Sequence, residues 1–190
     1  MSERARVSLL ALIVALVYAN SLTNGFTLDD GGNILTNATV AAPSIKALFT
    51  PLAGTKVFRP VLFATFALNW AIGGDHPFGY HLVNVLLHVA VTLLLYLVLR
   101  KLLERFTGAE VVAWLAALLF AVHPIHTEAV ASVTGRSELL AAGFLLAAWL
   151  LHLNDWPVAV LVFFALSLLS KESAVTFAPL VLVGDYVRGR

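Results

Sequence analysis

The sequence has 190 residues, of which 60% are hydrophobic and only 12% are charged, and its mean hydropathy is +0.90. A soluble domain is about half apolar and a quarter charged, so this composition predicts a membrane protein. The net charge of +1, with no cluster of Lys and Arg, argues against a nucleic-acid partner. The absence of cysteine excludes disulfides and thiolate metal sites.

The N-terminal third contains one apolar run followed by a long polar stretch. The run from Val7 to Leu22 is either a signal peptide or a first membrane helix, and we favour the helix because membrane-length segments follow it. Asn24–Arg59 is rich in Gly, Asn, Thr and Pro, which predicts an outer loop that extends over residues 24–78. Within this loop, Pro43–Phe49 and Pro60–Ile72 are expected to form interfacial or re-entrant helices, since both are too short to cross.

The rest of the chain, residues 79–190, predicts five further membrane helices. They are expected over Tyr80–Leu99, from Val111 to about His123, and over Thr134–Leu153, Trp156–Ser170 and Ala174–Val187. Their apolar cores fall short of the roughly 20 residues that a bilayer requires, so their polar ends should lie at depth and face protein. His81, Asn84 and His88 have i, i+3, i+7 spacing, which places them on one helix face that should look into the bundle.

The expected fold is therefore an all-α integral membrane module with about six transmembrane helices. The first helix is expected in residues 1–23, the outer loop with its interfacial helices in 24–78, and the second to sixth helices in 79–190. An even number of crossings brings distant ionisable residues to one side, and basic residues at the opposite helix ends place that side away from the cytoplasm. These residues are Asp29, Asp30, Arg59, His81, His123, His126, Glu128, Arg136, Glu138, Lys171 and Glu172. Ionisable groups at membrane depth indicate a functional site.

Two adjacent carboxylates, Asp29 and Asp30, follow the first helix. Neighbouring carboxylates raise each other's proton affinity, which suits one of them to act as a general base. A solvated turn is the alternative. Arg59 begins the second interfacial segment, where a guanidinium can bind a phosphate in bidentate fashion or extend to lipid headgroups.

The stretch from His123 to Glu128 resembles a metal site only weakly. His123 and His126 are three residues apart, whereas a zinc-binding helix typically has histidines four apart with a glutamate between them. We therefore favour hydrogen-bonded structural histidines and expect no metal.

Two further cations occur where a helix begins or breaks. Arg136 lies at the start of a helix, where the dipole disfavours it, so we expect an anionic partner. Lys171 lies between two apolar helices and is a second candidate for phosphate binding. The alternative is a set of internal ion pairs that these cations form with Glu128, Glu138 and Glu172.

Six blocks of sequence in the same order carry a resemblance to a known family. They are Asp29-Asp30 with Ile34 and Asn37, then Phe58–Leu62, Gly79–His88, Phe120–Ala129, Gly135–Glu138 and Ser170–Glu172. Together they resemble the transmembrane and tetratricopeptide-repeat proteins, which belong among the GT-C-type glycosyltransferases. The resemblance implies a GT-C-like N-terminal module that moves mannose, or another sugar, from a polyprenyl or dolichyl phosphate to a protein Ser or Thr.

The resemblance also implies roles for individual residues. Asp29 or Asp30 would be catalytic, and Arg59, Arg136 and Lys171 would hold the donor phosphate. The residues expected to shape the site are His81, His88, His123, His126, Glu128, Glu138 and Glu172. No metal or other cofactor is required, and the expected partners are the lipid bilayer, the donor and a protein acceptor. The site would lie on the periplasmic side of a bacterial inner membrane or the lumenal side of the endoplasmic reticulum.

The family continues through further helices and a repeat domain, and no repeat of period near 34 is visible in this sequence. Two other functions remain open. A transporter would carry polar residues through to the cytoplasmic helix ends, but those halves are Leu, Ala and Val. A non-catalytic membrane scaffold is the other alternative.

Overall fold

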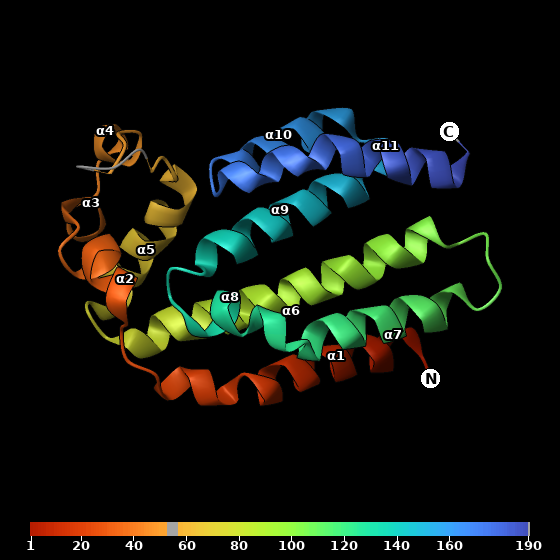
Figure 1. Cartoon of the computed structure of the whole chain (residues 1–190), viewed down its shortest axis with the longest axis horizontal. Coiled ribbons are helices and arrows are strands. Elements are labelled where there is room, and N and C mark those ends of the chain that lie inside the picture. The colour runs from red at the N-terminus through yellow and green to blue at the C-terminus, as the bar shows by residue number, and fades with distance from the viewer. Residues whose placement is uncertain (53–56, 190) are drawn as a thin grey trace.

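The computed structural model describes residues 1–52 and 57–189, and every regular element among them is helical. The long helix α6 (Pro77–Leu102) is central: it packs against α1 (Glu3–Val17), α7 (Ala109–Val122) and α9 (Arg136–His152). Helix α9 also packs against α10 (Pro157–Leu168), and α11 (Phe177–Arg188) contacts both α6 and α9. These helices all run along the long axis of the molecule (Figure 1).

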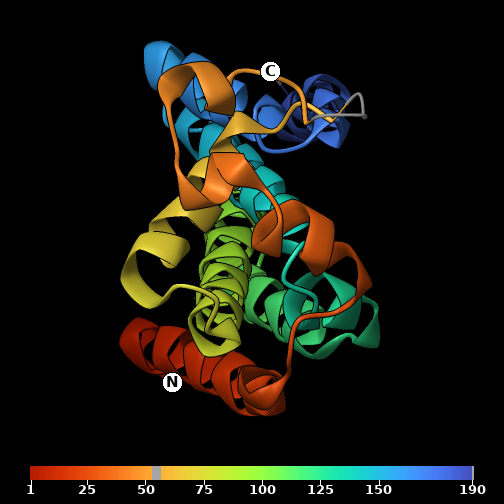
Figure 2. The same ribbon diagram turned by 90° about the vertical axis from the view of Figure 1, so that its left-hand side faces the viewer.

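The short elements of the outer loop lie together at one end of this bundle (Figures 1 and 2). They are α2 (Leu28–Asp30), the π-helical turn η2 (Gly31–Leu35), α3 (Ala38–Ala41), α4 (Ile45–Leu48) and α5 (Pro60–Gly73). Side-chain caps define several of them: Asn37 accepts from the Thr39 N–H and Ser44 from the Ala47 N–H. Helical structure is confirmed for both segments predicted in the loop, although α4 is shorter than expected, and their interfacial or re-entrant position stays a prediction.

Four further turns connect the long helices. They are η1 (Ala19–Thr23), η3 (Pro124–His126), α8 (Thr127–Ala131) and η4 (Glu172–Thr176). The chain therefore bends after α7 at His123-Pro124, and α8 leads back to the start of α9. This bend carries the polar stretch that separates the two apolar helices.

The number of membrane crossings is not settled by helix length. Among the described residues, α6 alone is long and apolar enough to span a membrane as one helix, and α7 with η3–α8 forms a second candidate only if the 50° bend lies within one span. Helices of 12 to 17 residues, such as α10 and α9, extend roughly 18–26 Å at 1.5 Å per residue, less than the roughly 30 Å of hydrocarbon. The all-α fold is confirmed, whereas the six crossings stay a prediction.

A buried apolar cluster attaches the outer loop to the bundle. Ile34 and Val40 from the loop pack with Phe66 of α5, Tyr80 of α6 and Leu140 of α9. Ile34, Val40 and Phe66 have no exposed surface. Because burying side chains of this size stabilises a protein by about 1.5–3 kcal/mol each, the loop is held as a packed layer.

The opposite end of the bundle is held by ion pairs. Arg6 of α1 pairs with Glu110 of α7, and Arg100 of α6 pairs with Glu3 of α1. Both chain termini lie at this end, away from the outer loop (Figure 1). The helix ends that carry the predicted site residues therefore lie at the other end of the bundle, next to the outer loop.

Candidate functional site

A cavity of about 640 Å³, which we call the polar pocket, lies where the outer loop meets the bundle. It is lined by the loop, the start of α5, the η3–α8 bend, the first turns of α9 and the break after α10. The predicted site residues that line it are Asp29, Arg59, His88, His126, Glu128, Glu138 and Lys171. All of them except His88 are among the residues that the sequence predicts to converge. The structure brings them to one cavity, and their position on one side of the membrane stays a prediction.

The structure separates the two adjacent aspartates. Asp30 is 1% exposed; its Oδ2 accepts from the Thr27 N–H at 2.7 Å and from the Thr27 hydroxyl at 3.1 Å, and its Oδ1 accepts from the Thr134 N–H at 3.2 Å. Asp29 is exposed and lines the polar pocket, and its carboxylate has no hydrogen bond or ion pair within the described part of the chain. Asp30 therefore serves the fold, while Asp29 alone is available to a ligand.

Two of the three predicted phosphate-binding cations line the polar pocket, each paired with a carboxylate. Arg59 donates to Glu172 from Nε at 3.2 Å and from Nη2 at 2.7 Å. Lys171 pairs with Glu138. The hydrogen bond from Arg59 lowers the pKa of the Glu172 carboxyl. An anionic ligand would have to compete with these carboxylates. Of the internal ion pairs that the sequence offered as an alternative, the one with Lys171 is present and none forms with Arg136.

Arg136 has no exposed surface and does not line the polar pocket. Its Nε donates to Asn84 Oδ1 at 2.9 Å, its Nη1 to Asn69 Oδ1 at 2.7 Å, and its Nη2 to the Tyr80 carbonyl at 2.9 Å. The guanidinium also lies over the ring of Phe66, 4.8 Å from its centroid. The expected anionic partner is therefore wrong, since every acceptor is neutral, and this geometry gives no support to Arg136 as a phosphate ligand.

The turn that delivers Arg136 depends on the glycine before it. A Cβ atom at Gly135 would lie 2.6 Å from the Ala129 carbonyl oxygen and 2.7 Å from that of Glu128. Only glycine allows α8 to approach the start of α9 this closely. The Gly135–Glu138 block thus positions both the buried Arg136 and the pocket-lining Glu138.

The predicted histidines take different positions. His88 is buried, its Nε2 lies 3.3 Å from the Ala121 carbonyl, and it lines the polar pocket beside His126, whose ring lies 4.1 Å from that of Phe120. His123 is exposed and its Nδ1 accepts from the Ile125 N–H, so it caps the turn and does not line the pocket. His81 is buried outside the pocket lining, and Glu172 reaches the site only through Arg59.

His81, Asn84 and His88 are each at most 1% exposed, which confirms the prediction that they face the bundle. The described residues include no group of three or more His, Asp or Glu arranged to hold a metal ion. Metal-independent chemistry stays a prediction.

Sequence reasoning missed Asn33 and Asn69, and it placed Asn84 on a buried face without giving it a partner. Asn33 lines the polar pocket next to Asp29, and Asn69 and Asn84 bind Arg136. A single Asn within the apolar helix α5 was a visible signal for Asn69, because an amide in such a helix needs a buried partner.

Comparison with known proteins fixes the family. Residues 56–188 match the family model described as dolichyl-phosphate-mannose-protein mannosyltransferase. The chain belongs to this family. Within the mannosyltransferase family, it is 38% identical over 90% of its length to protein O-mannosyl-transferase TMTC3 of Mus musculus, covering 20% of that protein. It is 41% identical over 85% of its length to protein O-mannosyl-transferase Tmtc1 of Drosophila melanogaster, covering 20% of it.

A protein O-mannosyl-transferase of Caenorhabditis elegans is 34% identical over the whole chain, which covers 29% of that protein. The chain therefore spans between a fifth and a third of these mannosyltransferases. No solved structure matches it. Membership of this family agrees with the composition in placing the chain in a membrane.

Proposed function

We propose that this chain forms the donor-binding and acid–base part of a protein O-mannosyltransferase that uses a polyprenyl-phosphate-linked mannose. The observation that carries the proposal is the polar pocket, where two exposed carboxylates, Asp29 and Glu128, have no hydrogen bond or ion pair among the described residues and lie with two cations, Arg59 and Lys171. This set supplies a base and two phosphate-binding groups. Family membership and the names of the relatives support the sugar and the type of acceptor.

In the proposed reaction, the hydroxyl oxygen of an acceptor Ser or Thr forms a bond to the anomeric carbon of the donor. The bond from that carbon to the phosphate oxygen breaks, and polyprenyl phosphate leaves with the electron pair. Asp29 takes the hydroxyl proton, and a positioned base of this kind contributes roughly 10²–10⁴-fold. Arg59 and Lys171 stabilise the charge that develops on the leaving phosphate.

The ion pairs of Arg59 and Lys171 fit this role. Glu172 and Glu138 compensate the two cations, which avoids uncompensated charge at membrane depth. A donor phosphate would replace Glu172 as the partner of Arg59. The Arg59 guanidinium presents two nitrogens to the two carboxylate oxygens, and a phosphate offers a pair of oxygens in the same geometry. We place the pocket on the side of the membrane opposite the chain termini, which is lumenal or periplasmic.

Transfer of radiolabelled mannose from polyprenyl-phosphate-mannose to an acceptor protein tests the proposal, with wild type, Asp29→Asn and Asp30→Asn compared. Asp29→Asn should lose at least about 100-fold in rate with an unchanged melting temperature, because the exposed carboxylate supports no contact. Asp30→Asn should lower the melting temperature, because it disturbs buried hydrogen bonds. Equal transfer rates for Asp29→Asn and wild type would overturn the assignment of the base.

A further inference from the structure

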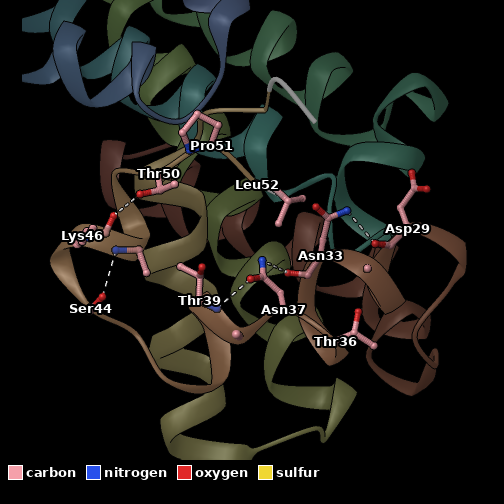
Figure 3. A pocket seen from close by; sticks show the side chains of 13 residues that line it. Asp29, Asn33, Thr36, Asn37, Thr39, Ser44, Lys46, Thr50, Pro51 and Leu52 are labelled. Carbon is pink, nitrogen blue, oxygen red and sulfur yellow. Dashed lines mark hydrogen bonds between the residues drawn. The ribbon is translucent and has the colours of Figure 1, made fainter. Parts of the chain in front are cut away.

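A second cavity of about 870 Å³, which we call the loop pocket, opens within the outer loop itself (Figure 3). Its described lining residues lie between Asp29 and Leu52, on α2, η2, α3, α4, the turns between them and the residues just after α4. Asp29 and Asn33 line both the loop pocket and the polar pocket. The candidate base therefore stands at the wall that the two cavities share.

Six of the thirteen described residues that line the loop pocket carry a hydroxyl or amide side chain. They are Asn33, Thr36, Asn37, Thr39, Ser44 and Thr50 (Figure 3). Several of their donor groups are already used inside the loop: the Asn33 amide donates to the Asp29 carbonyl at 2.8 Å, and the Thr50 hydroxyl to the Lys46 carbonyl at 2.7 Å. The Thr36 hydroxyl likewise donates to the Gly31 carbonyl at 3.1 Å. The side-chain oxygens of Asn37 and Ser44 already accept from main-chain N–H groups. Those of Asn33, Thr36, Thr39 and Thr50 accept no hydrogen bond from the described residues, and these suit a ligand rich in N–H donors.

The charges of the two cavities differ. The polar pocket is lined by two cations, Arg59 and Lys171, together with three carboxylates, whereas the described lining of the loop pocket has one cation, Lys46, and one carboxylate, Asp29. The loop pocket is thus poorly suited to a phosphate. Its described lining also has no aromatic ring on which the face of a sugar could stack. An extended polypeptide, with a main-chain N–H at each residue, has the chemistry that this lining accepts.

We propose that the loop pocket binds the acceptor polypeptide as an extended segment, mainly through main-chain N–H groups. The inference rests on the proposed function, because it makes Asp29 the junction at which the acceptor hydroxyl, entering from the loop pocket, meets the donor in the polar pocket. Recognition through the main chain sets few demands on acceptor side chains. The acceptor should therefore need a Ser or Thr in a flexible stretch rather than a long sequence motif.

Equilibrium binding of a fluorescent, unstructured peptide with one Thr to the reconstituted chain tests this inference without requiring turnover. Ala38 is exposed on α3 and lines the loop pocket, so Ala38→Trp fills the cavity without disturbing a packed residue. Ala42 is exposed at the end of the same helix and does not line it, so Ala42→Trp is the matched control. Ala38→Trp should weaken peptide binding at least about tenfold, and Ala42→Trp should not. A peptide with the main-chain amides around its Thr N-methylated should bind wild type similarly weakly.

Donor binding separates this inference from the proposed function. Affinity for polyprenyl-phosphate-mannose should be the same in Ala38→Trp, Ala42→Trp and wild type. Peptide binding that is lost in Ala38→Trp supports the acceptor site even if no mannose is transferred, a result that would overturn only the proposed function. Absence of peptide binding in wild type, equal binding by both Trp variants, or full binding of the N-methylated peptide would overturn the acceptor site even if transfer is observed.

Discussion

Asp30 and Thr134 are 104 residues apart in the sequence, yet Asp30 Oδ1 accepts a hydrogen bond from the Thr134 main-chain N–H at 3.2 Å. The contact joins α2 of the outer loop to the turn between α8 and α9. The other carboxylate oxygen of Asp30 completes a capping box with Thr27. One buried side chain thus fixes the position of its neighbour Asp29 relative to Glu138 and the rest of the polar pocket.

The first prediction concerns the stability that Asp30 provides. Asp30→Ala should lower the free energy of unfolding by about 1–3 kcal/mol, because two main-chain N–H groups lose their buried acceptor. Asp29→Ala is the matched control and should change it by less than about 0.5 kcal/mol, since its side chain is exposed. Thermal unfolding of the two variants in detergent measures the difference, and equal stability would mean that the link between loop and bundle is not formed.

The second prediction assigns Arg136 to the fold rather than to the donor. Arg136→Ala should cost about 3–5 kcal/mol, because the acceptors on Asn69, Asn84 and Tyr80 would be left buried without a donor. Arg136→Lys should not restore stability, since one ammonium cannot reproduce a planar set of donors. Unfolding midpoints and donor affinity of the folded fraction are the measurements. A stable Arg136→Ala protein with weakened donor binding would return Arg136 to the phosphate site.

Sequence reasoning succeeded where periodicity and local signals decide the structure. The apolar runs over Pro60–Ile72, Tyr80–Leu99 and Trp156–Ser170 predicted α5, α6 and α10, and the spacing of His81, Asn84 and His88 predicted a buried face. The convergence of Asp29, Arg59, Glu138 and Lys171 also followed from the order of the helices. The number of helices able to cross a membrane did not, because the apolar segments other than α6 fall short of a full span or bend.

Sequence reasoning failed where partners are chosen by packing in three dimensions. The two aspartates are adjacent and identical, and the contacts that Thr27 and Thr134 make with Asp30 determine which one is buried. Charge alone predicted an anionic partner for Arg136, but Asn69 of α5 and Asn84 of α6 meet it with neutral oxygens. These contacts connect helices that are distant in sequence, so no local pattern records them.

The third prediction concerns the close approach at Gly135. Gly135→Ala should destabilise the protein by about 1–3 kcal/mol, because its Cβ would lie 2.6 Å from a carbonyl oxygen of α8 and the backbone would have to shift. Gly143→Ala on the same helix is the control: its Cβ would meet Val91 Cγ2 at 3.5 Å, an ordinary contact, so it should be neutral or stabilising. The two unfolding midpoints should differ accordingly, and equal values would show that the turn yields without cost.

The last prediction uses the pair formed by Arg59 and Glu172. The hydrogen bond from Arg59 lowers the pKa of Glu172 in the folded protein. The pair therefore stabilises the folded protein at pH values above the ordinary carboxyl pKa of about 4.3. This contribution is lost as the pH falls through the lowered value. At neutral pH, Glu172→Gln should release Arg59 and tighten the binding of the donor or of polyprenyl phosphate by roughly two- to tenfold. In wild type, protonation of Glu172 in acid should likewise release Arg59 and raise the affinity for the donor. Glu172→Gln should not show this rise.

Glu128→Gln provides the control, because it removes the same charge from the polar pocket without freeing a guanidinium. Affinities are measured by titration of each variant at pH 7 and at low salt, where the difference should be largest. If both glutamine variants tighten binding equally, the effect is one of general charge in the pocket and Arg59 has no particular role. If neither variant binds the donor more tightly, release of Arg59 from Glu172 does not help donor binding. The phosphate must then be held by Lys171 alone.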